Sequence, residues 1–188
     1  MMRLVALMLI LSISILSTQA QYKFPAIDKS PMDMCYYPVN YPVLRVQNKI
    51  TEPLLARIVY SRPQKNGRQV FGELVEYGQV WRLGANEATE IELYSDCKVN
   101  GQKLKKGRYT LYAIPYEDKW TVIFNKETNI WGAFLYDEKK DVLRTDIKTE
   151  LQAEATEAFS MGFEKAGDSS INLVMAWDRV KAVLPFTF

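Results

Sequence analysis

The chain has 188 residues, with 24 Lys and Arg against 22 Asp and Glu and a formal net charge of +2 at pH 7. This balance lacks the clustered basic excess that a nucleic-acid or polyanion binder needs. Histidine is absent, which excludes Ser-His-Asp and Cys-His catalytic arrangements and histidine-ligated zinc, so any general acid or base must be a carboxylate, a lysine or a tyrosine.

Residues 1–20 have the pattern of a cleavable secretory signal peptide. Arg3 precedes the apolar run LVALMLILSISIL, and the small-residue site Thr18-Gln19-Ala20 follows it. The apolar run is shorter than the about 20 residues that span a bilayer. We therefore expect a periplasmic or secreted mature chain that begins near Gln21 and has no transmembrane segment.

Residues 21–43 are expected to form an extended strap. The stretch from 22 to 42 contains four prolines and four tyrosines without a regular period. Proline at this density disfavours both a helix and a central strand. The aromatic content predicts that the strap lies over the domain with its aromatic side chains inward.

Residues 44–188 show strand patterns separated by turn residues, which predicts one all-β domain. Asn66-Gly67 and Asn100-Gly101 each predict a tight hairpin. Apolar residues alternate with polar ones in TEIELYSDCKV (89–99), as in a strand with one wet face. RYTLYAIP (108–115), WTVIFN (120–125) and INLVMAW (171–177) are apolar at both parities, so we expect a second layer to cover them.

The predicted fold is a two-sheet antiparallel β-sandwich, with jelly-roll and immunoglobulin-like topologies both open. The segment TELQAEATEAFS (149–160) contains good helix formers, but a strand with a loop is equally compatible with it. The last residues predict a hairpin whose apolar positions are Phe159, Met161 and Phe163 on one arm and Ile171, Leu173, Met175 and Trp177 on the other.

Several stretches carry a resemblance to a known family. They are YSRPQKNGRQVFGELVEYGQVWRLGANEATEIE, KLKKGRYTLYAIP, WTVIFN, WGAFLYDEKKDVLR and the leader DKSPMDMCYYP. The chain resembles domain-of-unknown-function family 2911, exported envelope proteins of Bacteroidota-type bacteria with a WR-x-GANEAT motif. The resemblance implies an exported all-β domain without an established activity. It also implies an alanine and an apolar residue where this chain has Cys35 and Cys97, so a disulfide shared by the family is not expected.

The two cysteines have two interpretations. An exported chain can hold a disulfide between Cys35 and Cys97. Alternatively Cys97 is a small buried hydrophobe, because it shares strand parity with Ile91, Leu93 and Val99. We favour free thiols, because no sequence feature places the two residues side by side.

The run WRLGANEATE (81–90) is the candidate site. Extending the parity of Ile91 and Leu93 backward places Thr89 and Glu87 on the core-facing side. In a structural interpretation Glu87 pairs with Arg82 or Arg62, and Asn86 bonds its own turn backbone. In a functional interpretation the segments YSRP and WGAF converge on the turn and complete a ligand-binding cleft. Its floor is then Arg62, Trp81, Arg82, Asn86, Glu87, Thr89 and Trp131.

We expect a non-catalytic binding or accessory module of the cell envelope that contacts another envelope protein or a small polar ligand. The alternative is a glycosidase-like hydrolase that uses Glu87 with a second acid such as Asp137 or Glu73. No cofactor is indicated. Asp137, Glu138 and Asp141 lack the regular spacing of a calcium loop, so no metal site is expected either.

Overall fold

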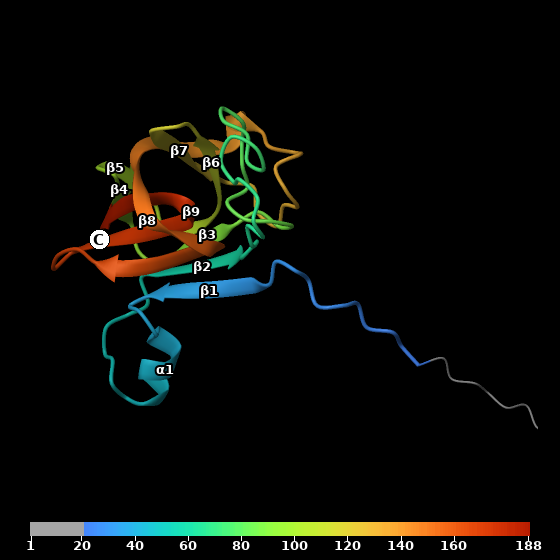
Figure 1. Cartoon of the computed structure of the whole chain (residues 1–188). Coiled ribbons are helices and arrows are strands. Elements are labelled where there is room, and N and C mark those ends of the chain that lie inside the picture. Colours follow the sequence, from blue (N-terminus) through green and yellow to red (C-terminus); the bar gives the residue numbers. More distant parts are fainter. Residues whose placement is uncertain (1–20) are drawn as a thin grey trace, which may run out of the picture.

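The computed structural model describes residues 21–188, and the expected signal peptide falls outside them (Figure 1). Over that range no helix is both long enough and apolar enough to cross a membrane.

Within the described residues the regular secondary structure consists of antiparallel strands, one short α-helix and one turn of 3-10 helix, η1. The elements in chain order are β1 (Met32–Tyr37), α1 (Tyr41–Val46), β2 (Ala56–Ser61), β3 (Glu90–Leu93), β4 (Cys97–Val99), β5 (Gln102–Leu104), β6 (Gly107–Pro115), β7 (Lys119–Asn125), η1 (Glu138–Lys140), β8 (Asp141–Lys165) and β9 (Ser170–Thr187). The predicted antiparallel all-β class is confirmed.

The nine strands form a single sheet in the order β1-β2-β3-β6-β7-β8-β9-β4-β5, with β1 and β5 at its edges. The expected division into two separate sheets is not confirmed. Figure 1 shows the strands curving around a common interior. A single curved sheet therefore supplies the burial that two stacked sheets would otherwise provide.

The long strand β8 allows this curvature. Residues 141–148 pair with β7, and the strand pairs with β9 from Thr149 onward. Between Leu151 and Ser160, β8 advances nine positions while β9 advances four, from Val180 to Ala176. Surplus residues of this kind bulge out of the ladder and bend the strand. The ambiguous segment 149–160 is therefore a bulged strand.

Aromatic side chains fill the interior of the curved sheet. The indole of Trp81 stacks on that of Trp177, with ring centroids 5.9 Å apart, and meets Trp120 edge-on at 5.6 Å. Phe71 and Phe159 pack against the same cluster. Three of the four tryptophans thus lie in the core.

A loop covers the outer face of β6 and β7, where Tyr112 and Ile123 are buried. The side chains packed there include Ile130, Ala133 and Tyr136, which belong to the segment between β7 and β8. The prediction of cover on both faces is confirmed for these two strands, and their second layer is this loop. The prediction is wrong for residues 171–177 of β9, where buried positions alternate with half-buried ones.

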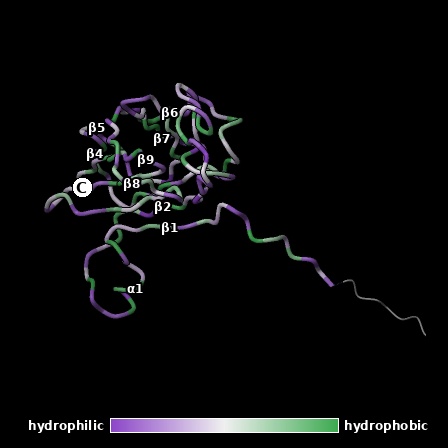
Figure 2. The backbone as a smooth tube through the Cα atoms, viewed as in Figure 1, coloured by the Kyte–Doolittle hydropathy of each residue, from purple (hydrophilic) through white to green (hydrophobic). Residues whose placement is uncertain are grey.

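The N-terminal segment differs from the expected strap. Tyr22 and Phe24 are 72% and 79% exposed, and the chain runs away from the domain before β1 (Figure 1). Hydrophobic and hydrophilic residues alternate in patches along it (Figure 2). Pro31 and Pro38 flank β1 without interrupting it, and an edge strand tolerates proline beside it.

The turn predictions are partly right. Asn100 and Gly101 connect β4 and β5 with φ values of 45° and 81°, as expected for a tight hairpin. Asn66 and Gly67 also adopt positive φ, and Arg68 N donates to Lys65 O at 3.0 Å across the turn. No pair of strands continues from this turn, since Gln64 bridges Ala158 of β8. The predicted hairpin at Asn66-Gly67 is therefore wrong.

The C-terminal hairpin is confirmed. Met161 lies opposite Met175, and Phe163 lies opposite Leu173. The apolar positions named for the two arms are all buried.

Candidate functional site

The turn at residues 81–90 is shaped by close contact with the end of β2. Gly84 has a φ of 156°, and a Cβ atom at this position would lie 2.8 Å from Ser61 Oγ. The Ser61 hydroxyl accepts a hydrogen bond from Ala85 N at 2.6 Å and donates one to Ala85 O at 2.5 Å. The segment YSRP therefore meets the turn, and the glycine lets the two backbones approach.

Trp81 and Thr89 belong mainly to the core. Trp81 is 6% exposed, and its indole Nε1 donates to Gly84 O at 3.2 Å. Thr89 is fully buried, and its hydroxyl donates to Leu83 O at 2.5 Å. The inward direction predicted for Thr89 is confirmed. Its single hydroxyl is already engaged within the turn.

Glu87 corrects the parity argument. Its side chain is exposed, and within residues 21–188 it forms no ion pair with Arg82 or Arg62. Regular strand geometry begins only at Glu90, so alternation cannot be extended backward through a turn in which Leu83 and Asn86 adopt positive φ. The predicted core-facing Glu87 is wrong.

Asn86 contacts the WGAF segment through its backbone. Its carbonyl accepts a hydrogen bond from Gly132 N at 2.8 Å. The amide side chain has no hydrogen-bond partner in the described part of the chain, so the predicted bond to its own turn is absent.

Arg62 is occupied by structural contacts. Its guanidinium donates to Asp33 Oδ2 at 3.0 Å, to Ser160 Oγ at 2.8 Å and to Phe159 O at 3.3 Å. These bonds join the N-terminal edge strand to β8. Arg62 does not line the hollow of about 310 Å³ that Glu87 lines, and its donors already have structural partners.

Arg82 differs from Arg62, because its guanidinium has no acceptor among residues 21–188. Its Nε is buried without a hydrogen-bond partner. Burial lowers the pKa of Arg82 from its ordinary value, since desolvation disfavours the charged form. Arg82 and Trp81 both line a cavity of about 220 Å³.

The segment WGAF converges on the turn from the other side. Ala88 N donates to Ile130 O at 2.9 Å, and Glu87 forms an isolated bridge with Trp131. Trp131, Phe134 and Leu135 are 60%, 84% and 76% exposed. The candidate residues thus separate into a cavity at Arg82 and an outward-facing loop beside Glu87.

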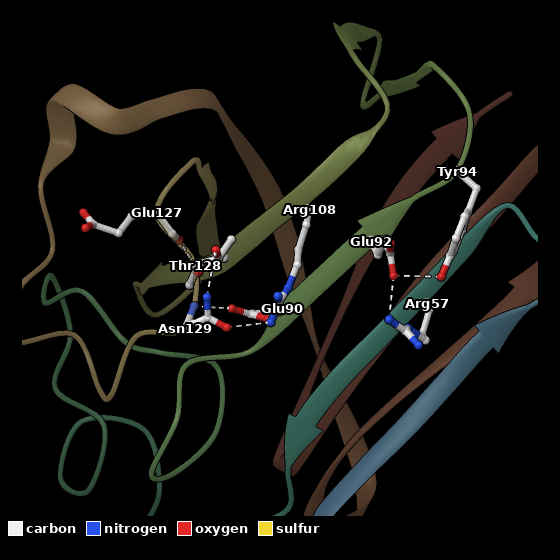
Figure 3. Close-up of polar contacts among 9 residues, drawn as sticks. Arg57, Glu90, Glu92, Tyr94, Arg108, Glu127, Thr128 and Asn129 are labelled. Carbon is white, nitrogen blue, oxygen red and sulfur yellow. Dashed lines mark hydrogen bonds and ion pairs between the residues drawn. The ribbon is translucent and has the colours of Figure 1, made fainter.

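Two polar clusters on the outer face of β2, β3 and β6 were not predicted (Figure 3). Arg57 Nη2 donates to Glu92 Oε2 at 2.6 Å, and the Tyr94 hydroxyl donates to the same oxygen at 2.7 Å. Burial, followed by this hydrogen bond, raises the pKa of Tyr94. The sequence signal was the polar parity of Glu90 and Glu92, but their partners on other strands could not be assigned.

The second cluster contains Glu90. Arg108 Nε donates to Glu90 Oε2 at 2.6 Å, and Asn129 N donates to Glu90 Oε1 at 2.6 Å. Both carboxylate oxygens therefore have donors. Because Glu92 pairs with Arg57 and Glu90 pairs with Arg108, the charges within each cluster are balanced.

A hollow of about 570 Å³ lies beside β4 and β5 and away from the motif. Its lining includes Lys98, Lys103 and Lys105, and Lys105 pairs with Asp96 at 2.8 Å. It shares no residue with the turn at 81–90.

The cysteines are free in the structure, as favoured from the sequence. Burial raises the pKa of Cys35 to about 12 and that of Cys97 to about 11, and Asp33 and Asp96 respectively add to the effect. No cluster of three or more potential metal ligands occurs among residues 21–188.

These observations define an all-antiparallel β protein that presents an aromatic loop and an arginine-lined cavity. A family model for proteins of unknown function (DUF2911) matches residues 42–186, and the chain belongs to that family. No curated protein and no solved structure matches it.

Proposed function

We propose that the protein is an exported, non-catalytic binding module of the cell envelope that contacts another protein through residues 128–136, the aromatic loop, together with Glu87. The observation that carries the proposal is the outward presentation of Trp131, Phe134 and Leu135 on a loop fixed from its inner side. The signal-peptide pattern of residues 1–20 and the resemblance to Bacteroidota-type envelope proteins support the location.

The aromatic loop is held in place before any partner arrives. Ile130, Ala133 and Tyr136 pack inward against the cluster that contains Tyr112 and Ile123. Tyr112 and Tyr136 meet edge-on, with ring centroids 5.1 Å apart. An ordered loop loses little conformational entropy when it binds.

Gly132 fixes the tip of the loop. It has a φ of 69°, and a Cβ atom there would lie 2.7 Å from the Phe134 ring. Its N–H donates to Asn86 O, which ties the tip to the turn at residues 81–90. The tip thus presents Trp131 and Phe134, and large aromatic side chains are the usual anchors of protein interfaces.

Charge favours a protein partner over an anionic bilayer surface. Glu87 is exposed beside Trp131 and has no ion-pair partner in the part of the chain that the structure describes. A carboxylate at this position opposes approach to anionic lipid headgroups. The same carboxylate complements a lysine or arginine on a protein that receives the two aromatic rings.

The glycosidase-like alternative requires a second acid that is free to work with Glu87. Glu90 lines the same hollow of about 310 Å³, but Arg108 and Asn129 engage both of its oxygens. Asp137 Oδ1 accepts from Lys139 N at 3.0 Å and begins η1. The binding role is therefore preferred. Turnover that disappears in a folded Glu87→Gln variant would instead support the hydrolase.

The experiment is a pull-down from solubilised native envelopes with the tagged mature chain, followed by mass spectrometry and quantified stoichiometry. We expect one partner near one-to-one. The double variant Trp131→Ala/Phe134→Ala should recover at least about thirty-fold less, because loss of one hot-spot side chain costs about 2 kcal/mol or more.

The matched control is Leu151→Ala, which removes an 84% exposed side chain from β8, outside the aromatic loop. It should recover the partner as the native chain does. Equal recovery by the double variant, or the absence of a stoichiometric partner, would contradict the proposal.

A further inference from the structure

A second site follows from the cavity of about 220 Å³ at Arg82. Trp81, Trp177 and Leu74 contribute apolar walls, and Arg68 and Arg82 both line it. Its lining contains no aspartate or glutamate. Two cationic side chains and no acidic side chain therefore line one cavity.

Neither of these two arginines has a counter-charge. Arg82 and Arg68 have no carboxylate within 4.0 Å in residues 21–188, and the same is true of Arg45 and Arg179, whereas Arg57, Arg62, Arg108 and Arg144 each pair with a carboxylate. Arg68 is exposed, but Arg82 is half-buried. A partly buried cation without a counter-charge costs free energy, so an anion bound beside Arg82 would stabilise the arrangement.

Arg68 is held in a fixed direction. Its Nε donates to Lys65 O at 2.8 Å, and its Nη2 donates to Gln64 O at 2.6 Å. Both acceptors are neutral carbonyls, so the positive charge of the guanidinium is not compensated. Its Nη1 makes no hydrogen bond within the described residues and stays free to donate.

Arg82 also lines a second hollow of about 260 Å³, which shares Leu74, Val75 and Trp81 with the cavity. Glu76 lines this second hollow and not the cavity, and it makes no ion pair among the described residues. Glu76 therefore does not form an ion pair with either arginine.

We propose that the cavity between Arg68 and Arg82 binds a single oxyanion group, a carboxylate or a phosphate. The forked guanidinium matches the two oxygens of such a group. The cavity is smaller than the roughly 300 Å³ at which sites for drug-sized ligands begin. The molecule or side chain that carries the oxyanion group is therefore small. The group arrives either on a free small molecule or on an acidic side chain of a peptide.

This site is independent of the aromatic loop, because Trp131 and Phe134 do not line the cavity. Failure of anion binding therefore leaves the loop proposal intact, and the reverse also holds.

The test titrates the purified mature protein with inorganic phosphate, succinate and a blocked aspartyl peptide at matched ionic strength. Tryptophan fluorescence can follow binding, because Trp81 and Trp177 line the cavity. We expect saturable binding of at least one probe. Binding of phosphate or succinate identifies a free small molecule as a source, and binding of the aspartyl peptide alone identifies a peptide.

Arg82→Met and Arg68→Met should each weaken binding at least about ten-fold, the loss expected when a charge-assisted hydrogen bond disappears. Arg45→Met is the control, since Arg45 bonds Tyr41 on α1 and does not line the cavity. Binding that is absent for all three probes, or that is weakened equally by Arg45→Met, would overturn the proposal. Unfolding curves recorded for every variant separate lost binding from lost folding.

Discussion

Replacing Gly84 by alanine tests whether the turn is shaped by the end of β2. The new Cβ would lie 2.8 Å from Ser61 Oγ and 3.2 Å from Ser61 O, at a φ of 156°. A side chain at a sparsely populated φ costs about 1–3 kcal/mol. Displacing the Ser61 hydroxyl from Ala85 also weakens two hydrogen bonds, each worth about 1 kcal/mol.

The expected loss for Gly84→Ala is thus about 2–4 kcal/mol of unfolding free energy, or about 5–15 °C in Tm for a domain of this size. Equilibrium urea unfolding followed by tryptophan fluorescence measures it. Gly162→Ala is the matched control, because its Cβ meets nothing within 4 Å and its φ is not positive. If Gly84→Ala costs no more than Gly162→Ala, the argument for the close approach is refuted.

Three further outcomes follow from the structure. Trp81→Ala should cost about 3–5 kcal/mol because it empties a core position, whereas Trp131→Ala should change stability by less than about 0.5 kcal/mol; equal losses in urea unfolding would contradict this assignment. With pKa values of about 12 and about 11, the Cys35 and Cys97 thiols are almost wholly protonated at pH 8. Only the thiolate form of a cysteine is a good nucleophile. Iodoacetamide should therefore modify them slowly in the folded protein and rapidly in urea, and rapid labelling of the folded chain would refute their burial. Arg82→Met should leave the urea midpoint unchanged or raise it, because it removes a partly buried cation without an acceptor; a clear loss would show that the charge is structurally paired.

Local strand patterning could be predicted from the sequence because alternation has a physical period inside a strand. Ile91, Leu93, Cys97 and Val99 are all buried, as their parity predicted, even though β3 and β4 are separate strands. The same argument failed for Glu87, which lies outside any regular strand. Parity is informative only where the backbone is extended.

The curvature of the sheet and the register of its strands could not be predicted from the sequence. The curvature of the sheet depends on surplus residues of β8 between Leu151 and Ser160, and this segment has a polar, helix-favouring composition. Pairing with β9 overrides that local preference. The register of β8 against β9 depends on residues far apart in the chain, so no short stretch of sequence predicts the curvature.

The candidate site was predicted as a set of segments but not as a set of side chains. YSRP and WGAF both contact the turn at residues 81–90, as the functional interpretation required. The side chains then diverge: Arg62 bonds to Asp33 and β8, while Trp131 points outward. Side-chain direction in turns depends on individual φ values, which composition does not specify.

The outward direction of the aromatic loop is central to the proposed role, and photo-crosslinking in native envelopes tests it most directly. A photo-crosslinking phenylalanine analogue in place of Phe134, which is 84% exposed, should give one discrete crosslinked protein. The same analogue in place of the equally exposed Leu151 should not give that product. The absence of any protein crosslink at position 134, or the same products at both positions, would contradict the account.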